Sequence, residues 1–333
     1  MFKSLESIIE DKKFSGVITI QKLDKIIYNR AFGYLDRANK VRNNIHTSFG
    51  IASGTKLFTA LGILKLVESK QLSLDTKLFD IIEKPFASYD PNVTIKQLLS
   101  HTSGLPDYYD EDLIDDFNNF KVSVPWYELL KPSDYMAVMP DRPMKFSPGE
   151  NFHYNNGAFV FLAMVIEILS GDYHQWIKEK IIKPNELKNT GFYKLNQLPE
   201  NTAYGYVDMD DSWRTNIYSL PIIAGGDGGI FTNSEDLITL WTQLLDYKIL
   251  SKNLTEVLLS PQTETNEDGH YGLGLWLDKK NGIYNPSIVG ADAGVSFIST
   301  HKIKENLTIN ILSNTSEGAW EVNAPIQELL KKI

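Results

Sequence analysis

Ser53 and Lys56 have the residue types and the spacing of a nucleophile and its base. They lie in the stretch 49–67, which is apolar on nearly every side after the lysine, as is typical of a buried helix. Because positions i and i+3 share one helical face, we expect the Lys56 amine beside the Ser53 hydroxyl. Unpaired backbone N–H groups in the first helical turn would point toward the group that Ser53 attacks. Together these are the parts of an activated serine.

The spacing alone leaves a structural interpretation open. Serine is a common N-cap residue, so Ser53 could only cap a helix while Lys56 is solvated. A second Ser-x-x-Lys, Ser299 to Lys302, lies in an alternating stretch that predicts a strand, where positions i and i+3 face opposite sides. We therefore consider only the Ser53 copy further.

Tyr154 and Asn156 form the only Tyr-x-Asn in the chain, on a loop that follows Pro148 and Gly149. A tyrosine beside a lysine can have its phenol pKa lowered and act as a general base. An asparagine can hold the carbonyl of a substrate amide. The alternative interpretation is that Tyr154 only packs on the apolar helix expected after it.

The elements that must position these residues change in character along the chain. Strands are expected at 16–22, 25–31, 272–277, 282–284, 295–299 and 307–312, and helices at 1–10, 53–69, 93–101, 158–169 and 323–333 with Pro325 in the first turn of the last. We expect Thr94 to cap the third of these helices, Gly171 to end the fourth, and a further helix to be capped near Ser234. Strands at both ends around a helical middle predict an α/β domain, residues 1–73 and 210–333. A mostly helical domain, residues 74–209, would be inserted into it, with the active site at the interface.

Composition and charge exclude several classes of function. The net charge of −9 argues against nucleic acid or an anionic membrane as partner. The absence of cysteine excludes disulfides, thiolate metal sites and a cysteine nucleophile, and the six histidines contain no His-x-x-x-His pair, so we expect no metal and no cofactor. No segment is long enough to span a bilayer and no signal-peptide pattern is present, which predicts a cytoplasmic protein, or an extracellular one if a leader has been removed.

Several short motifs occur in the order of one known superfamily. They are Ser53-x-x-Lys56, the segment 98–107 (LLSHTSGLPD), and Phe146-x-Pro-Gly-Glu150 followed by Tyr154-x-Asn156. In this the chain resembles the penicillin-binding-protein and serine β-lactamase superfamily, most of all its class C β-lactamase-like branch, which includes D-alanyl carboxypeptidases, D-amino-acid peptidases and esterases. The glycine-rich stretch 224–236 is similar to one in the family. The resemblance implies a β-lactamase/transpeptidase-like fold: an antiparallel sheet flanked by terminal helices, with an inserted helical domain.

The resemblance also implies roles for the residues. Ser53 would be the acylated nucleophile, Lys56 and Tyr154 would share the proton transfers, and Asn156 would orient the substrate. The oxyanion hole would combine the Ser53 N–H with a backbone N–H on a facing strand. Which of Lys56 and Tyr154 takes the serine proton stays open.

The third element of the family, Lys-Thr-Gly or His-x-Gly on that facing strand, is where the sequence departs. The pattern after Gly290 aligns Ile288-Val289-Gly290 with this element, so an isoleucine stands where a cation is usual. We expect Ile288, Gly290 and Ala291 at the substrate, with Ala291 as the second oxyanion donor. Literal matches occur elsewhere: 270–272 (HYG) comes too early, and 280–282 (KNG) is better interpreted as a turn.

The missing cation shifts the expected substrate. β-Lactams and D-Ala-D-Ala peptides carry a carboxylate that such a cation would attract, so esters and uncharged amides become more plausible, unless His153 replaces the charge. We therefore predict a serine hydrolase with a Ser53 acyl-enzyme: an esterase or a peptidase on D-amino-acid or small-peptide substrates, with weak β-lactam reactivity. Tyr108, Tyr109 and Trp126 are expected at the pocket rim.

Other functions and properties stay open. One alternative is a non-catalytic penicillin-binding-like protein that binds a ligand or partner, and another is a D-alanyl carboxypeptidase or β-lactamase. The sequence does not predict the oligomeric state.

Overall fold

An eight-stranded sheet forms the frame of the molecule, in the order β2-β1-β14-β13-β12-β11-β10-β9, with every neighbouring pair antiparallel. The computed structural model describes residues 2–265 and 269–331. The strands of the sheet come from both ends of the chain: β1 (Gly16–Lys22), β2 (Lys25–Phe32), β9 (Thr263–Glu264), β10 (His270–Tyr271), β11 (Trp276–Lys280), β12 (Ile283–Asp292), β13 (Val295–Lys302) and β14 (Leu307–Ser313). This confirms the predicted antiparallel sheet.

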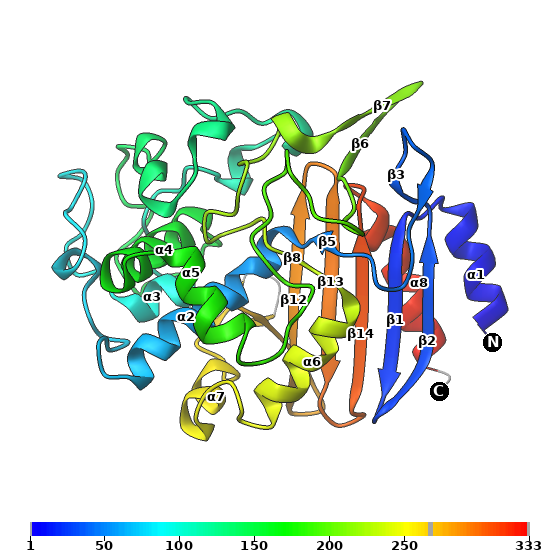
Figure 1. Cartoon of the computed structure of the whole chain (residues 1–333). Helices are drawn as coiled ribbons and strands as arrows, with labels where there is room; N and C mark the ends of the chain where they lie inside the picture. The colour runs from blue at the N-terminus through cyan, green and yellow to red at the C-terminus, as the bar shows by residue number, and fades with distance from the viewer. Residues whose placement is uncertain (1, 266–268, 332–333) are drawn as a thin grey trace.

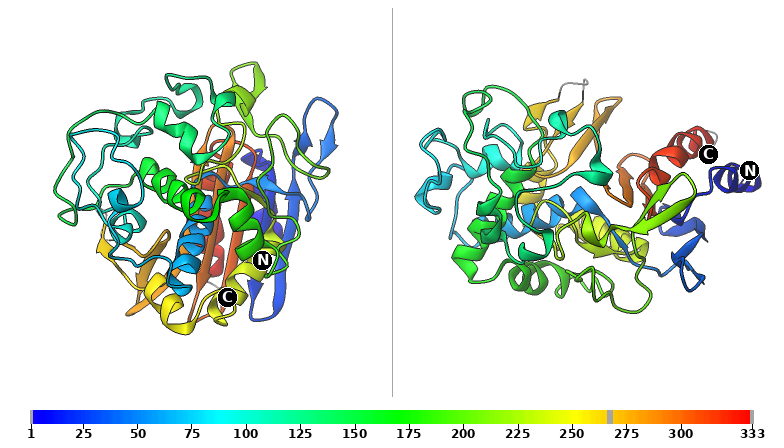
Figure 2. Two further views of the ribbon diagram at one scale, coloured as in Figure 1. Left: turned by 60° about the vertical axis from the view of Figure 1, so that its left-hand side comes forward. Right: turned by 90° about the horizontal axis from the view of Figure 1, so that it is seen from above.

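Helices cover both faces of this sheet (Figures 1 and 2). The terminal helices α1 (Phe2–Asp11) and α8 (Gly318–Leu330) contact each other, and α8 packs on β13 and β14. On the other face α6 (Ser234–Leu245) packs on β1 and β14. The predicted flanking of the sheet by terminal helices is therefore confirmed.

The remaining helices form a separate group beside the sheet. They are α2 (Thr55–Glu68), α3 (Ile95–Leu99), α4 (Asn156–Ser170), α5 (Tyr173–Ile177) and α7 (Lys252–Leu258). α4 packs against α2, α3 and α5, and most residues of α2 and α4 are buried. Their all-round apolar sequences are explained by this position between layers.

Short two-stranded ladders join the loops around the frame. β3 (Tyr34–Asp36) pairs with β4 (Val41–Arg42), β5 (Phe49–Gly50) with β8 (Phe231–Thr232), and β6 (Tyr206–Met209) with β7 (Ser212–Thr215). The β5–β8 ladder fixes the chain immediately before Ser53 against the glycine-rich stretch. The positions of the nucleophile and of that stretch are thereby linked.

Several predicted helix ends are confirmed by their capping interactions. Thr94 and Gln97 form a capping box at the start of α3, and Gly171 ends α4 with φ of 89°. α6 is capped by Asn233, one residue before the expected Ser234. The predicted ends at Met1 and Ile333 lie outside the described residues.

Three predicted boundaries were wrong. The strand predicted at 282–284 is β12, which runs from Ile283 to Asp292 because it pairs with β11 and then with β13. α8 begins at Gly318 and places Pro325 inside the helix, because its buried stripe of Ala319, Val322 and Ile326 starts before the proline. β11 begins at Trp276 and not at Gly272, because the Gly272 N–H donates to the Leu275 carbonyl in a tight turn.

The proposed division into two domains stays a prediction. The β6–β7 hairpin spans the proposed boundary at 209–210, and one apolar cluster includes residues of the sheet and of α2, α3 and α4. Among the described residues no single helix is long and apolar enough to cross a membrane. The pair 156–170 and 173–182, bent by 86°, passes that test only when taken together, and α4 is mostly buried inside the protein.

Candidate active site

Ser53 lies in a one-turn 3-10 helix, Ala52–Gly54, directly before α2 and beside β12. Ala52, the residue before it, is buried and has φ of 43°, a left-handed conformation that costs an L-residue about 1–2 kcal/mol. Strain of this kind persists only where the surrounding structure imposes it, and it is common at functional sites. Here it sets the turn that presents Ser53 to a pocket.

The Lys56 amine is held by three oxygen atoms. Its Nζ lies 2.8 Å from Ser53 Oγ, 2.7 Å from Asn156 Oδ1 and 2.9 Å from the Asp227 carbonyl oxygen. The last two atoms can only accept hydrogen bonds, so in the neutral amine they would take its two hydrogens. The nitrogen lone pair would then face the Ser53 hydroxyl, which is the arrangement of a base with its nucleophile.

Burial favours that neutral form of the amine. Lys56 is 1% exposed, and burial lowers its pKa, an effect that the negative charges of Asp227 and Glu111 oppose. The pKa nevertheless stays below the ordinary lysine value. A lysine buried beside a serine and with a lowered pKa is chemically able to accept the serine proton.

Asn156 is oriented by its second amide atom. Its Nδ2 donates to the Tyr109 carbonyl oxygen at 2.9 Å and to Glu111 Oε1 at 3.1 Å, which turns Oδ1 toward Lys56. Asn156 is also the first residue of α4, whose N-cap Asn155 accepts from the Ala158 N–H at 2.7 Å. The start of α4 therefore fixes the amide that contacts the base.

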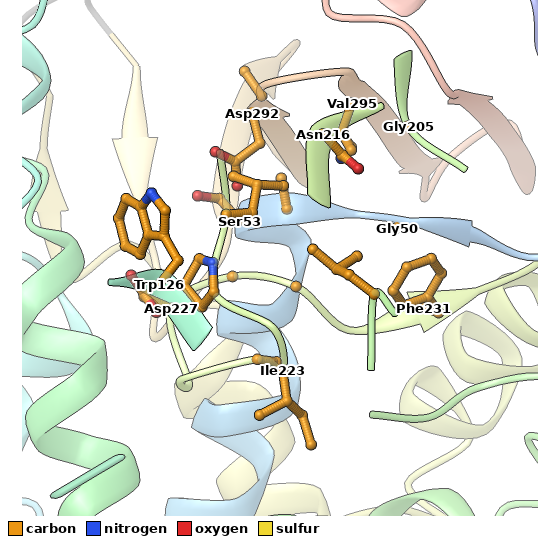
Figure 3. Close-up of a pocket in the computed structure, with 18 of the residues that line it drawn as sticks. Gly50, Ser53, Trp126, Gly205, Asn216, Ile223, Asp227, Phe231, Asp292 and Val295 are labelled. Carbon is orange, nitrogen blue, oxygen red and sulfur yellow. The ribbon is translucent and has the colours of Figure 1, made fainter. Parts of the chain in front are cut away.

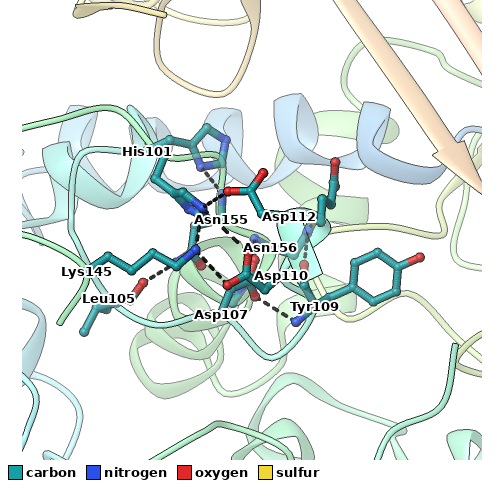
Figure 4. A network of polar contacts seen from close by, with 12 residues as sticks. His101, Leu105, Asp107, Tyr109, Asp110, Asp112, Lys145, Asn155 and Asn156 are labelled. Carbon is teal, nitrogen blue, oxygen red and sulfur yellow. Dashed lines mark hydrogen bonds and ion pairs between the residues drawn. The ribbon is translucent and has the colours of Figure 1, made fainter. Parts of the chain in front are cut away.

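Asp107 and His101 support the loop that carries Tyr154 and Asn156 (Figure 4). The buried carboxylate of Asp107 accepts from the backbone N–H groups of Asn156 at 2.5 Å and Gly157 at 2.8 Å. His101 Nδ1 accepts from the Asn155 N–H at 3.1 Å, and burial keeps the pKa of this histidine well below its usual value. The segment 98–107 thus positions the Tyr-x-Asn loop, a role that its sequence did not reveal.

His153 belongs to a separate polar network on this loop. Its Nε2 lies 2.9 Å from Asp112 and 2.5 Å from Lys145 Nζ, which also contacts Asp110 at 2.7 Å. Asp110, Asp112 and His153 have the ligand types of a metal site, but the ammonium group of Lys145 already lies among them. His153 does not line the pocket of Ser53, so the idea that it replaces the missing cation is not supported.

Tyr154 lies beside Ser53 and Lys56 but is not prepared to lose its proton. Its ring stacks on Trp276 with a centroid distance of 5.8 Å, and Lys56 Nζ is 4.9 Å from the ring centre. Burial raises the pKa of Tyr154 well above its usual value, and a hydrogen bond with Ser53 offsets this only in part. The expectation of a lowered phenol pKa was wrong, because the effect of burial on the pKa is larger than that of the Ser53 hydrogen bond.

The segment 288–290 faces the turn that carries Ser53. A β-carbon at Gly290 would lie 2.2 Å from the Ile51 carbonyl oxygen and 3.0 Å from the Ala52 β-carbon, so only glycine allows this approach. Ala291 lines the pocket of Ser53. Ile288 is 2% exposed within the main apolar cluster and is not among the lining residues, so the chain has neither a cation nor an open side chain at that position.

The discarded motif copies lie where their sequences predicted. Ser299 is buried on β13 and accepts from Trp241 Nε1 of α6, whereas Lys302 contacts Gln327 of α8 on the opposite face of the sheet. His270 belongs to β10, and Asn281 and Gly282 form the turn between β11 and β12 with positive φ.

The pocket of Ser53 has an acidic part that the sequence analysis missed. Its charged lining residues, among those described, are Glu111, Asp227 and Asp292, and the expected Tyr108, Tyr109 and Trp126 also line it. Burial raises the pKa of Asp292 to about 7, helped by the charge of Asp227. Asp227 and Asp292, the two nearest of these acids in sequence, are 65 positions apart, so only the folded chain brings the three acids together.

The glycine-rich stretch brings the Asp227 carbonyl to Lys56. A β-carbon at Gly226 would lie 2.4 Å from the β-carbon of Ala163 on α4, so the backbone passes this helix closely. The Gly226 carbonyl accepts from Thr59 Oγ1 of α2 at 2.6 Å. The stretch is therefore a backbone contact for the base and its helix.

The relationship to known proteins agrees with this geometry. A family profile described as Beta-lactamase matches residues 5–330. The chain belongs to the beta-lactamase family. Family membership and the fold place it in the penicillin-binding-protein and serine β-lactamase superfamily, as its motifs suggested, and make it a serine hydrolase by class.

Three relatives illustrate the range of similarity to this beta-lactamase family member. Penicillin-binding protein 4* of Bacillus subtilis is 30% identical over 94% of this chain and 70% of its own. A crystal structure of a penicillin binding protein from Bacillus halodurans superposes with a TM-score of 0.92 at 40% identity, covering 98% of this chain and 99% of that one. The structure of an octameric penicillin-binding protein homologue from Pyrococcus abyssi has a TM-score of 0.85 at 26% identity, covering 99% of this chain and 77% of that one.

Proposed function

We propose that this protein hydrolyses esters or small amides through an acyl-enzyme on Ser53. The observation that supports this most directly is the 2.8 Å contact between Lys56 Nζ and Ser53 Oγ, with the other two contacts of the amine made to oxygen acceptors. In this arrangement Lys56 is the base and Tyr154 the proton relay. Asn156 orients the Lys56 amine and also helps to orient the carbonyl group of a substrate amide.

The reaction would proceed in two halves. Ser53 Oγ attacks the carbonyl carbon while its proton passes to Lys56, and the N–H groups of Ser53 and Ala291 stabilise the oxyanion. The bond to the leaving alcohol or amine then breaks, and that group takes a proton from Lys56 by way of the Tyr154 hydroxyl. Water attacks the Ser53 ester in the second half, with Lys56 again as base, and releases the acid and free Ser53.

The substrate follows from what β12 lacks. Ile288 offers no charge to a substrate carboxylate, which supports esters or amides without a carboxylate near the scissile bond over β-lactams and D-Ala-D-Ala peptides. D-Amino-acid and small-peptide substrates remain within this class. Replacing Ile288 by His or Lys should raise the acylation rate with a penicillin, and an unchanged rate would argue against our placement of the third motif.

Hydrolysis of a p-nitrophenyl ester tests the proposed role of Ser53. The Ser53→Ala variant should lose at least about 10³-fold in kcat/KM, as loss of a nucleophile does in related mechanisms. Circular dichroism should show an unchanged fold, because Ser53 is at the pocket surface. Full ester turnover by a folded Ser53→Ala protein would refute the assignment.

A non-catalytic ligand-binding protein is the second candidate, and the loss of the cation at Ile288 is the observation that favours it. This function predicts that small ligands raise the melting temperature while no ester is turned over. The retained contacts among Ser53, Lys56 and Asn156 favour the hydrolase. A D-alanyl carboxypeptidase or β-lactamase is a third candidate and would require acylation by carboxylate-bearing substrates.

A further inference from the structure

The pocket of Ser53 is negatively charged, and this charge bears on the substrate. Glu111, Asp227 and Asp292 are its charged lining residues among those described. The buried amine of Lys56 is the nearby base, and burial favours its neutral form. The pocket is a candidate site because Ser53 lines it and the Lys56 amine contacts Ser53.

The three acids have neutral partners in place of cations. Tyr108 donates to Asp227 at 2.6 Å, Tyr109 to Asp292 at 3.5 Å, and Asn156 to Glu111 at 3.1 Å. No ion pair within 4.0 Å joins any of these acids to a lysine, arginine or histidine in the part of the chain that the structure describes. Asp227 is buried and Asp292 is half-buried, and carboxylates in such positions are usually paired.

Near these acids, one buried polar group has no hydrogen-bond partner in the described part of the chain. The hydroxyl of Tyr135 is fully buried and has no hydrogen-bond partner among the described residues. Burial raises the pKa of the Tyr135 hydroxyl, and the negative charges of Asp227 and Asp292 raise it further. Tyr135 packs edge-on against Tyr108 of the pocket wall. Buried polar groups are rarely left unsatisfied, so this region has hydrogen-bonding capacity that the chain does not use.

Asp292 occupies a particular place on β12. Ile288, Gly290 and Asp292 alternate onto one face of this strand, the face that approaches the turn before Ser53. Ile288, where the family has a cation, is buried in the core, whereas Asp292 lines the pocket. The charge that β12 presents to a substrate is therefore negative.

The opposite wall of the pocket is apolar. It is formed by side chains that include Leu195, Leu220, Ile222, Ile223 and Phe231. Figure 3 shows Ser53 with Asp292 beside it and Asp227 on the same side, while Phe231 lies across the pocket. A substrate with a positively charged group next to the reacting carbonyl would match the acidic wall, and an apolar side chain on it would match the other wall.

We infer that the substrate presents a free ammonium group beside the scissile carbonyl, with Asp292 and Asp227 as its counter-ions and an apolar side chain on the opposite wall. Such substrates are esters or amides of an amino acid with an unblocked amino group. The three N–H donors of an ammonium would meet carboxylates that now lack a cation. This inference rests on the proposed function for the reaction itself, but the binding preference can be measured without turnover.

Binding to the Ser53→Ala protein tests the preference without hydrolysis. Calorimetry at pH 7.5 would compare phenylalaninamide, in both enantiomers, with N-acetylphenylalaninamide and N-succinylphenylalaninamide. We expect the better enantiomer of the free amine to bind at least tenfold more tightly than the N-acetyl compound, and the N-succinyl compound to bind most weakly. Equal or tighter binding of the N-acetyl compound would overturn the inference.

Matched variants locate the preference in the pocket. Asp292→Asn in the Ser53→Ala background should reduce the tenfold preference to less than threefold, whereas Asp246→Asn, an exposed acid paired with Lys248, should leave it unchanged. Glu111→Gln, on an exposed side chain, serves if Asp292→Asn does not fold and should weaken the preference in the same direction. An undiminished preference in both pocket variants would contradict the assignment to these acids.

The two proposals fail in different ways. If wild-type protein is labelled at Ser53 by a fluorophosphonate but shows no preference for the free amine, the hydrolase stands and the ammonium inference is wrong. If the amine preference is present but Ser53 is neither labelled nor needed for ester turnover, the proposed function is wrong and the charge selectivity stands.

Discussion

The amide oxygen of Asn156 lies 2.7 Å from the amine nitrogen of Lys56, although 100 positions separate the two residues in sequence. A neutral acceptor at this place holds an N–H of the amine without favouring its charged form as a carboxylate would. The contact therefore orients the Lys56 lone pair toward Ser53 and leaves its pKa lowered by burial.

Asn156→Asp should consequently impair the base. A carboxylate in contact with Lys56 would stabilise the ammonium form and raise its pKa, so the rising limb of kcat/KM should move to higher pH by about one unit or more. At pH 7 the rate should fall about tenfold or more. The control is Asn92→Asp, because Asn92 accepts from Lys77 at 2.8 Å in an exposed pair. An unshifted pH–rate profile in Asn156→Asp would contradict this role.

Asp292 should make stability depend on pH. Its folded-state pKa is raised from 3.8 to about 7, so the folded protein binds its proton more readily than the unfolded chain does. Its contribution to the free energy of unfolding therefore decreases as pH rises from about 4 to 7. Asp292→Asn should raise the melting temperature by a few °C at pH 8 and not at pH 3.5. An equal shift at both pH values would show that proton binding is not the cause.

Gly290 should tolerate no side chain. Alanine there would place a β-carbon 2.2 Å from the Ile51 carbonyl oxygen, so β12 or the Ser53 turn must move. We expect Gly290→Ala to cost about 1–3 kcal/mol of unfolding free energy, measured by urea denaturation, and about 10²-fold in kcat/KM. At Gly50 a β-carbon would find its nearest atoms at 3.7 Å, so Gly50→Ala should cost less than about 1 kcal/mol. Equal stability losses would contradict the close-approach argument.

Asp107 should matter for both stability and rate. Asp107→Ala would leave the N–H groups of Asn156 and Gly157 without their acceptor inside the protein, at a cost of about 2–4 kcal/mol. The loop that holds Asn156 would loosen, so kcat should fall more than KM rises. Asp116→Ala is the control, since Asp116 accepts from the Asn118 N–H in an exposed turn. If kcat were unchanged in a folded Asp107→Ala protein, the loop would not depend on this carboxylate.

The sequence predicted those features that depend on short spacings. Ser53 and Lys56 share a helical face, Thr94 caps α3, and the alternation in β13 separates Ser299 from Lys302. The sheet order follows from strands at both chain ends once the family fold is inferred. These features are local or follow from a known topology, so residue patterns are sufficient to find them.

Other features depend on contacts that no spacing encodes. Asp227 and Asp292 meet at Ser53 only because the glycine-rich stretch and β12 approach the same turn. The pKa of Tyr154 depends on how deeply its ring is buried among Trp276, Tyr271 and His101, and the sequence shows only the neighbouring lysine. The start of α8 was misplaced because a proline was given more weight than the buried stripe around it.

Covalent labelling of Ser53 tests the central claim most directly. Wild-type protein would be incubated with a fluorophosphonate, its intact mass measured, and the modified residue identified in the digested protein, with Ser53→Ala and the exposed Ser88→Ala in parallel. We predict one adduct per chain, located on Ser53, absent from Ser53→Ala and retained by Ser88→Ala. An adduct that persists in Ser53→Ala, or no adduct on the folded wild-type protein, would contradict the claim that Ser53 is an activated nucleophile.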